Sequence, residues 1–270
     1  MDGDKLSQNK IHIDGMDFIE IESCRFIMGT IDGDELATAL EKRRNIWISK
    51  SFYVQTTPVT TGQYFKFINE TGYDHDYYIE KWDGEDWVIG PHFMEINSRG
   101  ENYPIVGVSY YDAHKYIEWA SKKHGKTFRL PTEAEFELAA RSGCKCIGNC
   151  KYAMLVNQEG LSRKEEEKPR SAPREVKKGI VTEIGLYDMH GLVWQWCEDW
   201  FFHYDSEELV DPKGPEKEPH YAPWKGERWA PGKVIRGGSF NYPYYHSRCS
   251  NRHYSKPSDR NINVGFRLFI

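Results

Sequence analysis

Helix-start signals occur at three places in this chain and restrict regular helix to three short segments. A Ser or Thr side chain ahead of an apolar run accepts a hydrogen bond from an otherwise free backbone N–H. Asp112 and Glu135 each follow such a residue by three positions and complete a reciprocal cap. We therefore expect helices that begin at Thr60 or Thr61, at Ser109 and at Thr132, and that end at Gly72, at Gly125 and near Arg141.

Short strands are expected around these helices. Apolar and polar residues alternate in residues 16–28 and 47–54, which is the pattern of half-buried strands. Residues 104–108 form a brief apolar run, and the last segment, 234–270, has strand-like ends around an irregular polar middle. Short strands mixed with a few helices are typical of an α+β domain.

Loops are predicted for much of the remaining chain. Residues 73–103 are aromatic and acidic, residues 205–233 are rich in Pro, Gly and charge, and Arg163–Lys168 is expected to be a solvated charge run. The 270 residues include 9 Trp, 17 Tyr and 13 Phe. Aromatic side chains bury large areas, and the polar tips of Tyr and Trp can bond to irregular backbone. A loop-rich domain with an aromatic core is therefore expected.

Charge and hydropathy argue against nucleic-acid binding and against a membrane-spanning segment. The formal net charge is −5 and the isoelectric point is about 6.1, which gives no support for nucleic-acid binding. No run of 18 apolar residues is present, so no transmembrane segment is expected. Residues 1–10 are polar and lack the apolar core of a signal peptide. The compartment stays open: the cell surface after processing for a display protein, the cytoplasm otherwise.

Six cysteines are scattered along the chain, and a chain of this length does not need disulfides to fold. Cys144, Cys146 and Cys150 form the only notable spacing, for which a zinc site, a disulfide within a loop and reduced thiols are all open. A structural zinc site needs four ligands, and no second cysteine pair lies nearby, so the thiol and disulfide alternatives are favoured. The other three are Cys24, Cys197 and Cys249.

Four sequence blocks in fixed order resemble the formylglycine-generating-enzyme, or sulfatase-modifying-factor, family. They are FIMGT at 26–30, residues 104–141 with RLPTEAEF at 129–136, GLYDMHGLVWQW at 185–196, and RGGSF at 236–240 with VGFR at 264–267. The resemblance covers nearly the whole chain and implies a C-type-lectin-like fold. It assigns residues 16–270 to the family domain and residues 1–15 to an N-terminal extension.

The family's oxidases carry a cysteine pair shortly after the Gly-Gly-Ser turn, where the resemblance implies Cu(I) bound by soft thiolates. Residues 240–249 of this chain contain only Cys249, in a position that resembles a structural one. No catalytic residue is therefore assigned, and the family's cysteine oxidation is not expected. The alternative is a formylglycine-generating-enzyme-like oxidoreductase, or another metal-dependent oxidase, that uses the same cleft without the cysteine pair.

Metal ligands other than thiols are sparse in the sequence. His246 and His253 could join a metal site, but no carboxylate completes a facial triad, so surface histidines are the simpler interpretation. Family members often bind structural calcium, yet the usual Asn of that site is Leu192 here. An apolar side chain cannot coordinate a hard cation, which leaves Asp188 and Asn157 as weak candidates. No other cofactor is expected.

The segment 241–263 is dense in Tyr, Ser, Asn, His and Arg, residue types that make adaptable contacts in antibody paratopes. It also resembles the variable region of lectin-fold proteins diversified by retroelements, whose Asn-type codons cannot become Lys, Glu, Gln, Trp or Met. Those five types make up 66 of the 270 residues, whereas the segment contains only Lys256. Ordinary family members also have Asn- and Ser-rich tails, so both explanations stay open.

The tail, residues 240–263, is therefore the candidate ligand-binding segment. Its positive residues outnumber its single acid, Asp259, which favours a mildly anionic ligand. The partner is an unknown protein or small molecule, and a display protein, an enzyme or enzyme accessory, and a scaffold-only subunit are the three hypotheses. The candidate contact residues are Tyr242, Tyr244, Tyr245, His246, Ser247, His253, Tyr254, Ser255, Ser258 and Ile262.

Overall fold

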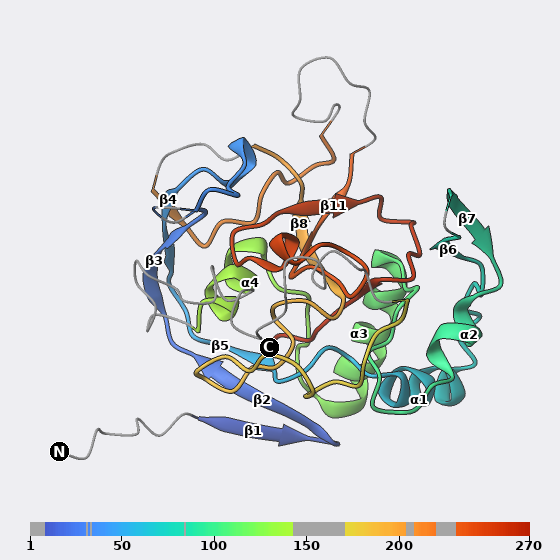
Figure 1. The fold of residues 1–270 in the computed structure, drawn as a ribbon. Helices are drawn as coiled ribbons and strands as arrows, with labels where there is room; N and C mark the ends of the chain where they lie inside the picture. The colour runs from blue at the N-terminus through green and yellow to red at the C-terminus, as the bar shows by residue number, and fades with distance from the viewer. Residues whose placement is uncertain are drawn as a thin grey trace.

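A computed structural model describes residues 9–30, 32, 34–83, 85–142, 171–203, 208–219 and 231–270. Short strands and irregular segments surround four helices among these residues (Figure 1). The α+β class and the C-type-lectin-like architecture expected from the sequence are confirmed. The Cys144–Cys150 cluster, Asn157 and the Arg163–Lys168 charge run lie outside the described residues.

The helices begin and end where the capping signals predicted. In α1 (Thr61–Thr71) and α3 (Tyr110–His124), the caps Thr60 and Ser109 accept from the backbone three residues on, and each helix ends at a left-handed glycine. In α4 (Glu133–Ala140), Thr132 and Glu135 form the expected capping box. The three predicted helices are confirmed.

The first sheet has the order β1–β2–β5 and joins the two ends of the domain. Antiparallel pairing links β1 (Lys10–Ile13) to β2 (Met16–Ile21) and β2 to β5 (Phe52–Gln55). The C-terminal residues return beside β5, where Phe269 bridges Val54. The segment 10–13, which the sequence placed in an N-terminal extension, is thus a strand of this sheet.

The central sheet has the order β11–β10–β8–β12 and carries the candidate site. It consists of β8 (Trp194–Trp200), β10 (Lys233–Arg236), β11 (His253–Ser255) and β12 (Val264–Gly265), with β12 parallel to β8 and the other pairs antiparallel. Both Trp194 and Trp196 are buried, two positions apart on β8. Alternate residues of a strand share a face, so the two indoles lie on the same face of β8.

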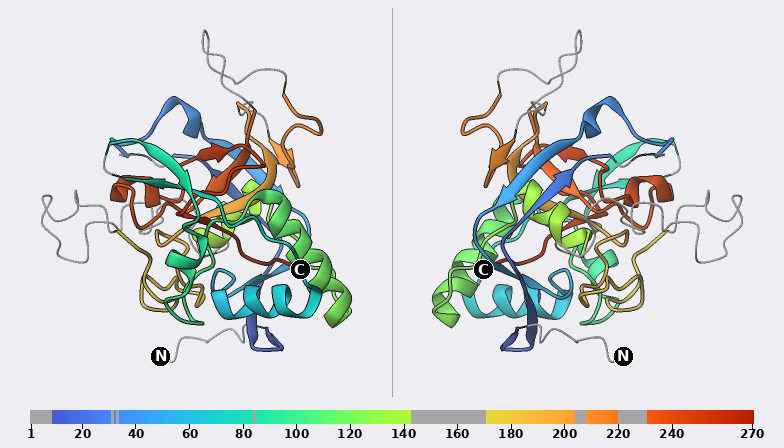
Figure 2. Two further views of the ribbon diagram at one scale, coloured as in Figure 1. Left: turned by 90° about the vertical axis from the view of Figure 1, so that its right-hand side faces the viewer. Right: turned by 90° about the vertical axis from the view of Figure 1, so that its left-hand side faces the viewer.

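A third sheet and a hairpin complete the strands of the described chain. The third sheet joins β3 (Cys24–Met28), β4 (Arg44–Ile48) and the short β9 (Leu209–Val210). The hairpin pairs β6 (Ile79–Trp82) with β7 (Trp87–Gly90) and is followed by α2 (Phe93–Asn97). Its position is at the periphery, beyond α3 (Figures 1 and 2).

The prediction of a loop at 73–103 is therefore wrong for β6, β7 and α2. The hairpin could not be predicted from the sequence, because the three exposed residues of β7 are apolar and do not alternate with polar residues. The strand β6 is also supported from outside its own region, because Glu80 forms a parallel bridge with Asn261 of the tail. Such a long-range partner is invisible to local pattern.

Aromatic residues dominate the core between α1 and α3. Tyr64 stacks on Tyr116 at a ring separation of 5.8 Å, and Phe266 packs edge-on against both. Edge-on and stacked arrangements are the favourable geometries for aromatic pairs. The expected aromatic core is confirmed. Among the described residues, none of the helices has the length and apolar character needed to cross a membrane.

Candidate functional site

Two consecutive glycines shape the start of the tail. Gly237 has φ +99° and Gly238 has φ +75°, a left-handed backbone that glycine adopts without strain. A Cβ atom on Gly238 would lie 2.5 Å from Ser247 Oγ and 2.9 Å from the His246 carbonyl oxygen. The glycine pair thus lets the short 3₁₀ turn of residues 244–247 pack directly on the end of β10.

A buried ion pair fixes the end of that turn to a distant segment. The Arg248 guanidinium donates to both carboxylate oxygens of Glu41, at 2.7 and 2.8 Å, and also to Asp34 at 2.6 Å. Ser250 Oγ donates to the same Glu41 carboxylate at 2.6 Å. Burial alone would raise the pKa of Glu41, but the hydrogen bonds from Arg248 and Ser250 outweigh it and hold that pKa below its usual value.

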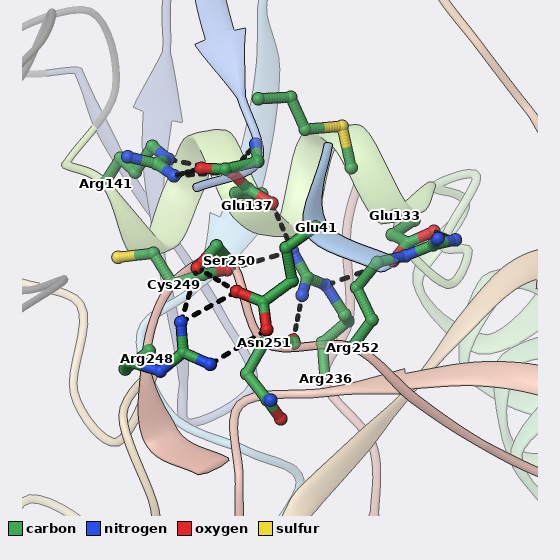
Figure 3. Close-up of polar contacts among 12 residues, drawn as sticks. Glu41, Glu133, Glu137, Arg141, Arg236, Arg248, Cys249, Ser250, Asn251 and Arg252 are labelled. Carbon is green, nitrogen blue, oxygen red and sulfur yellow. Dashed lines mark hydrogen bonds and ion pairs between the residues drawn. The ribbon is translucent and has the colours of Figure 1, made fainter. Parts of the chain in front are cut away.

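Helix α4 supplies two more carboxylates to the same network (Figure 3). Arg252 donates to both oxygens of Glu133, at 2.7 and 2.8 Å. Arg236 of β10 donates to Glu137 and, at 2.9 Å, to the carbonyl oxygen of Cys249. Paired, hydrogen-bonded charges of this kind lock a unique geometry at little net gain in stability. The tail is therefore anchored to α4, β10 and the 34–41 turn.

Above this anchor, four ring side chains form a half-buried cluster, here called the aromatic–imidazole patch. Trp194 of β8 is its floor, with ring centroids 5.6 Å from Tyr242, 6.1 Å from His246 and 5.3 Å from His253. Tyr242 lies edge-on to His246 at 5.2 Å. Tyr245 extends the patch outward, since it contacts His246 at 4.5 Å and is 38 % exposed.

Burial keeps the patch uncharged near neutral pH. It lowers the pKa of His246 and of His253 below the usual histidine value, and it raises the pKa of Tyr242. His253 Nδ1 lies 2.8 Å from the backbone nitrogen of Tyr254 and 2.9 Å from the Tyr254 carbonyl oxygen, so its role as donor or acceptor depends on the tautomer of the ring. The patch therefore offers phenol, imidazole and indole groups without formal charge.

The structure divides the predicted contact residues by exposure. Tyr245 and Ser258 are exposed, whereas Tyr242, His246, His253 and Tyr254 are half-buried. Ser247, Ser255 and Ile262 are buried, at 9, 8 and 5 % exposure, so their side chains do not face a ligand. Tyr244 belongs to the 3₁₀ turn, and its side chain is outside the described part.

Four of these outcomes correct the sequence interpretation, and the first is the burial of Ser247 against the glycine pair. Ile262 packs in the main hydrophobic cluster, because its backbone N–H bonds to Glu80 and turns the side chain into the core. Ser255 Oγ donates to Asp259 within the tail. The histidines 246 and 253 are not simple surface residues, since His246 lies edge-on to Trp194 and His253 packs against it at a tilt.

Three of the four positive residues of the tail, all but the exposed Lys256, are paired with carboxylates. Arg248 and Arg252 are buried against Glu41 and Glu133, and Arg260 donates to Asp112 at 2.8 Å. Their charges are balanced inside the protein, so the expectation of a mildly anionic ligand is not supported at these residues. The sequence missed this because each carboxylate partner lies more than a hundred residues away.

Trp194 belongs to the patch, although the sequence analysis did not include it among the candidate contact residues. Its contact with Tyr242 depends on the tail folding back over β8, which is fixed by two backbone bonds: Trp194 N–H to the Asn263 carbonyl at 2.9 Å and Phe240 N–H to the Leu192 carbonyl at 3.0 Å. Asn263 also donates to Asn241 Oδ1 at 2.8 Å and ties the two ends of the tail together. No local sequence pattern shows that the tail folds back over β8 in this way.

The candidate calcium ligand Asp188 is already engaged. Its carboxylate is buried and accepts from the Lys177 backbone N–H at 2.9 Å and from Arg174 at 3.3 Å. Within the described ranges, no group of three or more His, Cys, Asp or Glu side chains is placed to hold a metal ion. Leu192 occupies a left-handed backbone position, φ +80°, that suits Asn better than Leu.

The thiols near the site are inaccessible. Cys249 is 3 % exposed and its carbonyl oxygen accepts from Arg236, and Cys197 is fully buried in β8. Burial raises the pKa of the Cys197 thiol well above its usual value, which disfavours the thiolate that binds metal. Cys24 takes part in a disulfide.

The sulfatase-modifying factor enzyme 1-like domain matches residues 4–270 of this chain. The chain belongs to this family. Within the family, it is 27 % identical to the formylglycine-generating enzyme of Streptomyces coelicolor over 92 % of the chain and 87 % of that enzyme. It is also 28 % identical to the serine/threonine-protein kinase pkn1 of Chlamydia pneumoniae, of which it spans 37 %.

Solved structures show the same fold. PvdO from Pseudomonas aeruginosa superposes with a TM-score of 0.75 at 26 % identity and covers 97 % of both chains. The Treponema denticola variable protein 1 superposes with a TM-score of 0.65 at 20 % identity over 97 % of this chain and 98 % of that one. The second likeness concerns the fold alone.

The residues present do not fit the copper site that the resemblance implies for the family's oxidases. The segment after the Gly-Gly-Ser turn offers the amide of Asn241 and the ring of Tyr242, and neither is a soft thiolate donor. The one cysteine of that segment, Cys249, is buried under the ion-pair network. No reaction step through copper is derived from this arrangement.

Proposed function

We propose that this sulfatase-modifying-factor domain is a binding module and that the aromatic–imidazole patch is its recognition surface. The single observation that carries the proposal is the ring of Tyr242, packed against Trp194 just after the Gly-Gly-Ser turn. Where an oxidase of the family would present thiols, this chain presents an aromatic surface. Such a surface can contribute contact area and hydrogen bonds to a ligand.

The frame beneath the patch supports this role. Arg248, Arg252 and Arg236 hold the tail through buried ion pairs, so the side chains above them are displayed from a fixed backbone. Tyr residues on a fixed backbone bind at low cost in conformational entropy. The residues left for direct contact are Tyr242, Tyr245, His246, His253, Tyr254 and Ser258.

The chemistry of the patch favours an uncharged ligand surface with an apolar or ring-shaped face. Its histidines are neutral near pH 7, and the nearby arginines are paired. Planar rings pack on aromatic walls, and the phenol and imidazole N–H and O–H groups satisfy a few polar atoms. Retroelement diversification of the tail remains part of the proposal, and an imperfect repeat beside the gene, differing only at template adenines, would support it.

The test is a screen of the purified domain against arrayed glycans and a displayed peptide library, followed by titration of each hit. The variants Tyr242→Ala and Tyr245→Ala should each weaken the best ligand about tenfold or more, as expected for central aromatic contacts. Tyr111→Ala is the matched control, because Tyr111 is an exposed tyrosine on α3, outside the tail. Unchanged ligand affinity in both tail variants would contradict the proposal that the patch is the recognition surface.

The alternative, an oxidase that uses the same cleft, rests on the closeness of His246 and His253 to one indole. It needs at least one further ligand, which the described residues do not place beside the two imidazoles. Metal analysis of the purified domain distinguishes the two. Stoichiometric iron or copper lost in the double variant His246→Ala/His253→Ala, together with turnover of a cysteine peptide, would favour the enzyme.

A further inference from the structure

The hairpin of β6 and β7 carries a concentration of exposed apolar side chains that the proposed function does not use. It projects at the periphery of the molecule (Figures 1 and 2). Ile89 is the most exposed large hydrophobic residue of the described chain, at 68 %. Six of these exposed side chains gather in and around the hairpin: Tyr77, Tyr78, Trp87, Val88, Ile89 and Met94.

The backbone of β7 has an outer edge to which a further strand could bind. Glu80 N–H donates to the Arg260 carbonyl at 2.8 Å, and the Glu80 carbonyl accepts from Ile262 N–H at 2.9 Å, so both groups face the tail. Glu80 is directly opposite Ile89. In an antiparallel pair, residues opposite each other point their backbone groups the same way relative to the pair, inward or outward. The N–H and C=O of Ile89 therefore point to the outer edge.

None of the strands in the described chain pairs with this outer edge. Proteins usually protect an exposed edge with Lys, Pro, a bulge or a covering segment. The strand β7 reads Trp-Val-Ile-Gly, and its first three residues are exposed. Both faces of the strand are thus open around an apolar edge, which is the arrangement that accepts an added strand.

The charge around the hairpin indicates the charge of a strand that could bind to the outer edge of β7. Residues 74–95 contain only one lysine, Lys81, which pairs with Glu95 at 2.7 Å. Asp76 is also paired, with Arg260 at 3.6 Å. A second copy of the hairpin would bring like charges together, which is unfavourable across a strand pair. The carboxylates of this stretch are Asp74, Asp76, Glu80, Asp83, Glu85, Asp86 and Glu95.

We propose that the outer edge of β7 is a docking edge for an extended, apolar and basic segment of another protein. The segment adds as a strand beside β7 and exchanges hydrogen bonds with the N–H and C=O of Ile89. Its apolar side chains contact Trp87 and Ile89 on one face and Val88 on the other. Its Lys or Arg side chains face the carboxylates of the hairpin. This surface is separate from the aromatic–imidazole patch, so each proposal can fail without the other.

The probe is a synthetic eight-residue peptide of alternating Lys and Val with blocked ends, and the control peptide has Glu in place of Lys. Titration at low salt, followed by amide NMR, should show the Lys-Val peptide binding with shifts centred on Ile89. The Glu-Val peptide should bind at least about tenfold more weakly, and added salt should weaken the Lys-Val complex.

The variant Ile89→Pro tests the backbone edge. Proline removes an N–H that faces outward and is tolerated on an edge strand, so the fold is expected to survive while peptide affinity falls about tenfold or more. Ile89→Ala keeps the N–H and should lose less. If Ile89→Pro disturbs the circular dichroism spectrum, Glu85→Lys replaces it, because this change leaves the strand backbone intact and should also weaken the Lys-Val peptide.

Three results would overturn the proposal. The first is no binding of the Lys-Val peptide at about 1 mM, which is a binding free energy of roughly −4 kcal/mol. The second is equal binding of the Glu-Val peptide. The third is a homodimer in light scattering that Ile89→Pro dissociates, which would assign the edge to a second copy of this chain.

Discussion

Arg248 and Glu41 lie 207 positions apart in the sequence and meet in a two-pronged ion pair inside the protein. Their side chains are 3 % and 0 % exposed. The pair fixes the tail directly below the patch formed by Tyr242 and His246. The proposed recognition surface thus depends on a contact between the tail and a turn near the start of the domain.

Breaking this pair from one side should be costly. Glu41→Ala leaves the Arg248 charge buried without its main partner, so we expect a loss of about 3–5 kcal/mol in the free energy of unfolding. Urea denaturation monitored by tryptophan fluorescence measures it. Glu118→Ala is the control, because its pair with Lys115 is solvent-exposed and should contribute less than about 1 kcal/mol. A loss below 1 kcal/mol for Glu41→Ala would contradict the assigned role.

Gly238 should resist substitution more strongly than another glycine with similar backbone. Gly238→Ala combines a left-handed backbone with a Cβ contact of 2.5 Å to Ser247 Oγ, whereas Gly15, at φ +80°, has no atom within 4 Å of its Cβ position. Left-handed alanine alone costs about 1–2 kcal/mol. We expect Gly15→Ala to cost that amount and Gly238→Ala to cost clearly more, in thermal or urea unfolding. Equal losses would show that the 244–247 turn moves freely.

Stability should fall as the pH drops from neutrality toward 5. Burial lowers the folded-state pKa of His190, His246 and His253 below the usual value of 6.5. Between the folded-state and unfolded-state pKa values, the unfolded chain therefore binds more protons than the folded chain. The contribution of these histidines to folding stability is thus fully present above about pH 6.5 and is lost as the pH falls below it. Each histidine contributes at most about 1.4 kcal/mol per pH unit.

The variant His253→Gln isolates one of these histidines. Its free energy of unfolding should depend less steeply on pH between 7 and 5 than that of the parent chain. An identical slope in the variant and in the parent chain would assign the acid sensitivity to other groups.

Asp199 should have the opposite effect on the pH dependence of stability, because its contribution falls as the pH rises. Burial, helped by the nearby Glu133 charge, raises the pKa of Asp199 to about 8, while its carboxylate accepts from the Glu133 backbone N–H. The folded state then holds a proton that the unfolded state releases, so this contribution is lost as the pH rises from about 4 to 8. The free energy of unfolding of Asp199→Asn, relative to that of the parent chain, should therefore rise by roughly 1 kcal/mol per pH unit between pH 5 and 8. A constant difference across that range would refute the raised pKa.

Local sequence was sufficient for three of the four helices of the described residues and for the family. Thr60, Ser109 and Thr132 cap their helices through bonds to residues three positions away, so the information lies within one turn of chain. The Gly-Gly-Ser turn also has a local reason, because a Cβ atom on Gly238 would lie 2.5 Å from Ser247 Oγ, only nine residues away. The resemblance rested on such short blocks, and the match over residues 4–270 confirms it.

The sequence by itself thus determined the fold class, the boundaries of α1, α3 and α4, and the absence of neighbouring thiols after the Gly-Gly-Ser turn. Only the tertiary structure decided which tail side chains face outward, since Ile262 and Ser255 are buried and Tyr245 is exposed. It also decided that Arg248 is paired with Glu41 and that β6 bonds to the tail. The physical reason is distance along the chain: caps close within three residues, whereas burial and ion pairing depend on segments up to two hundred residues apart.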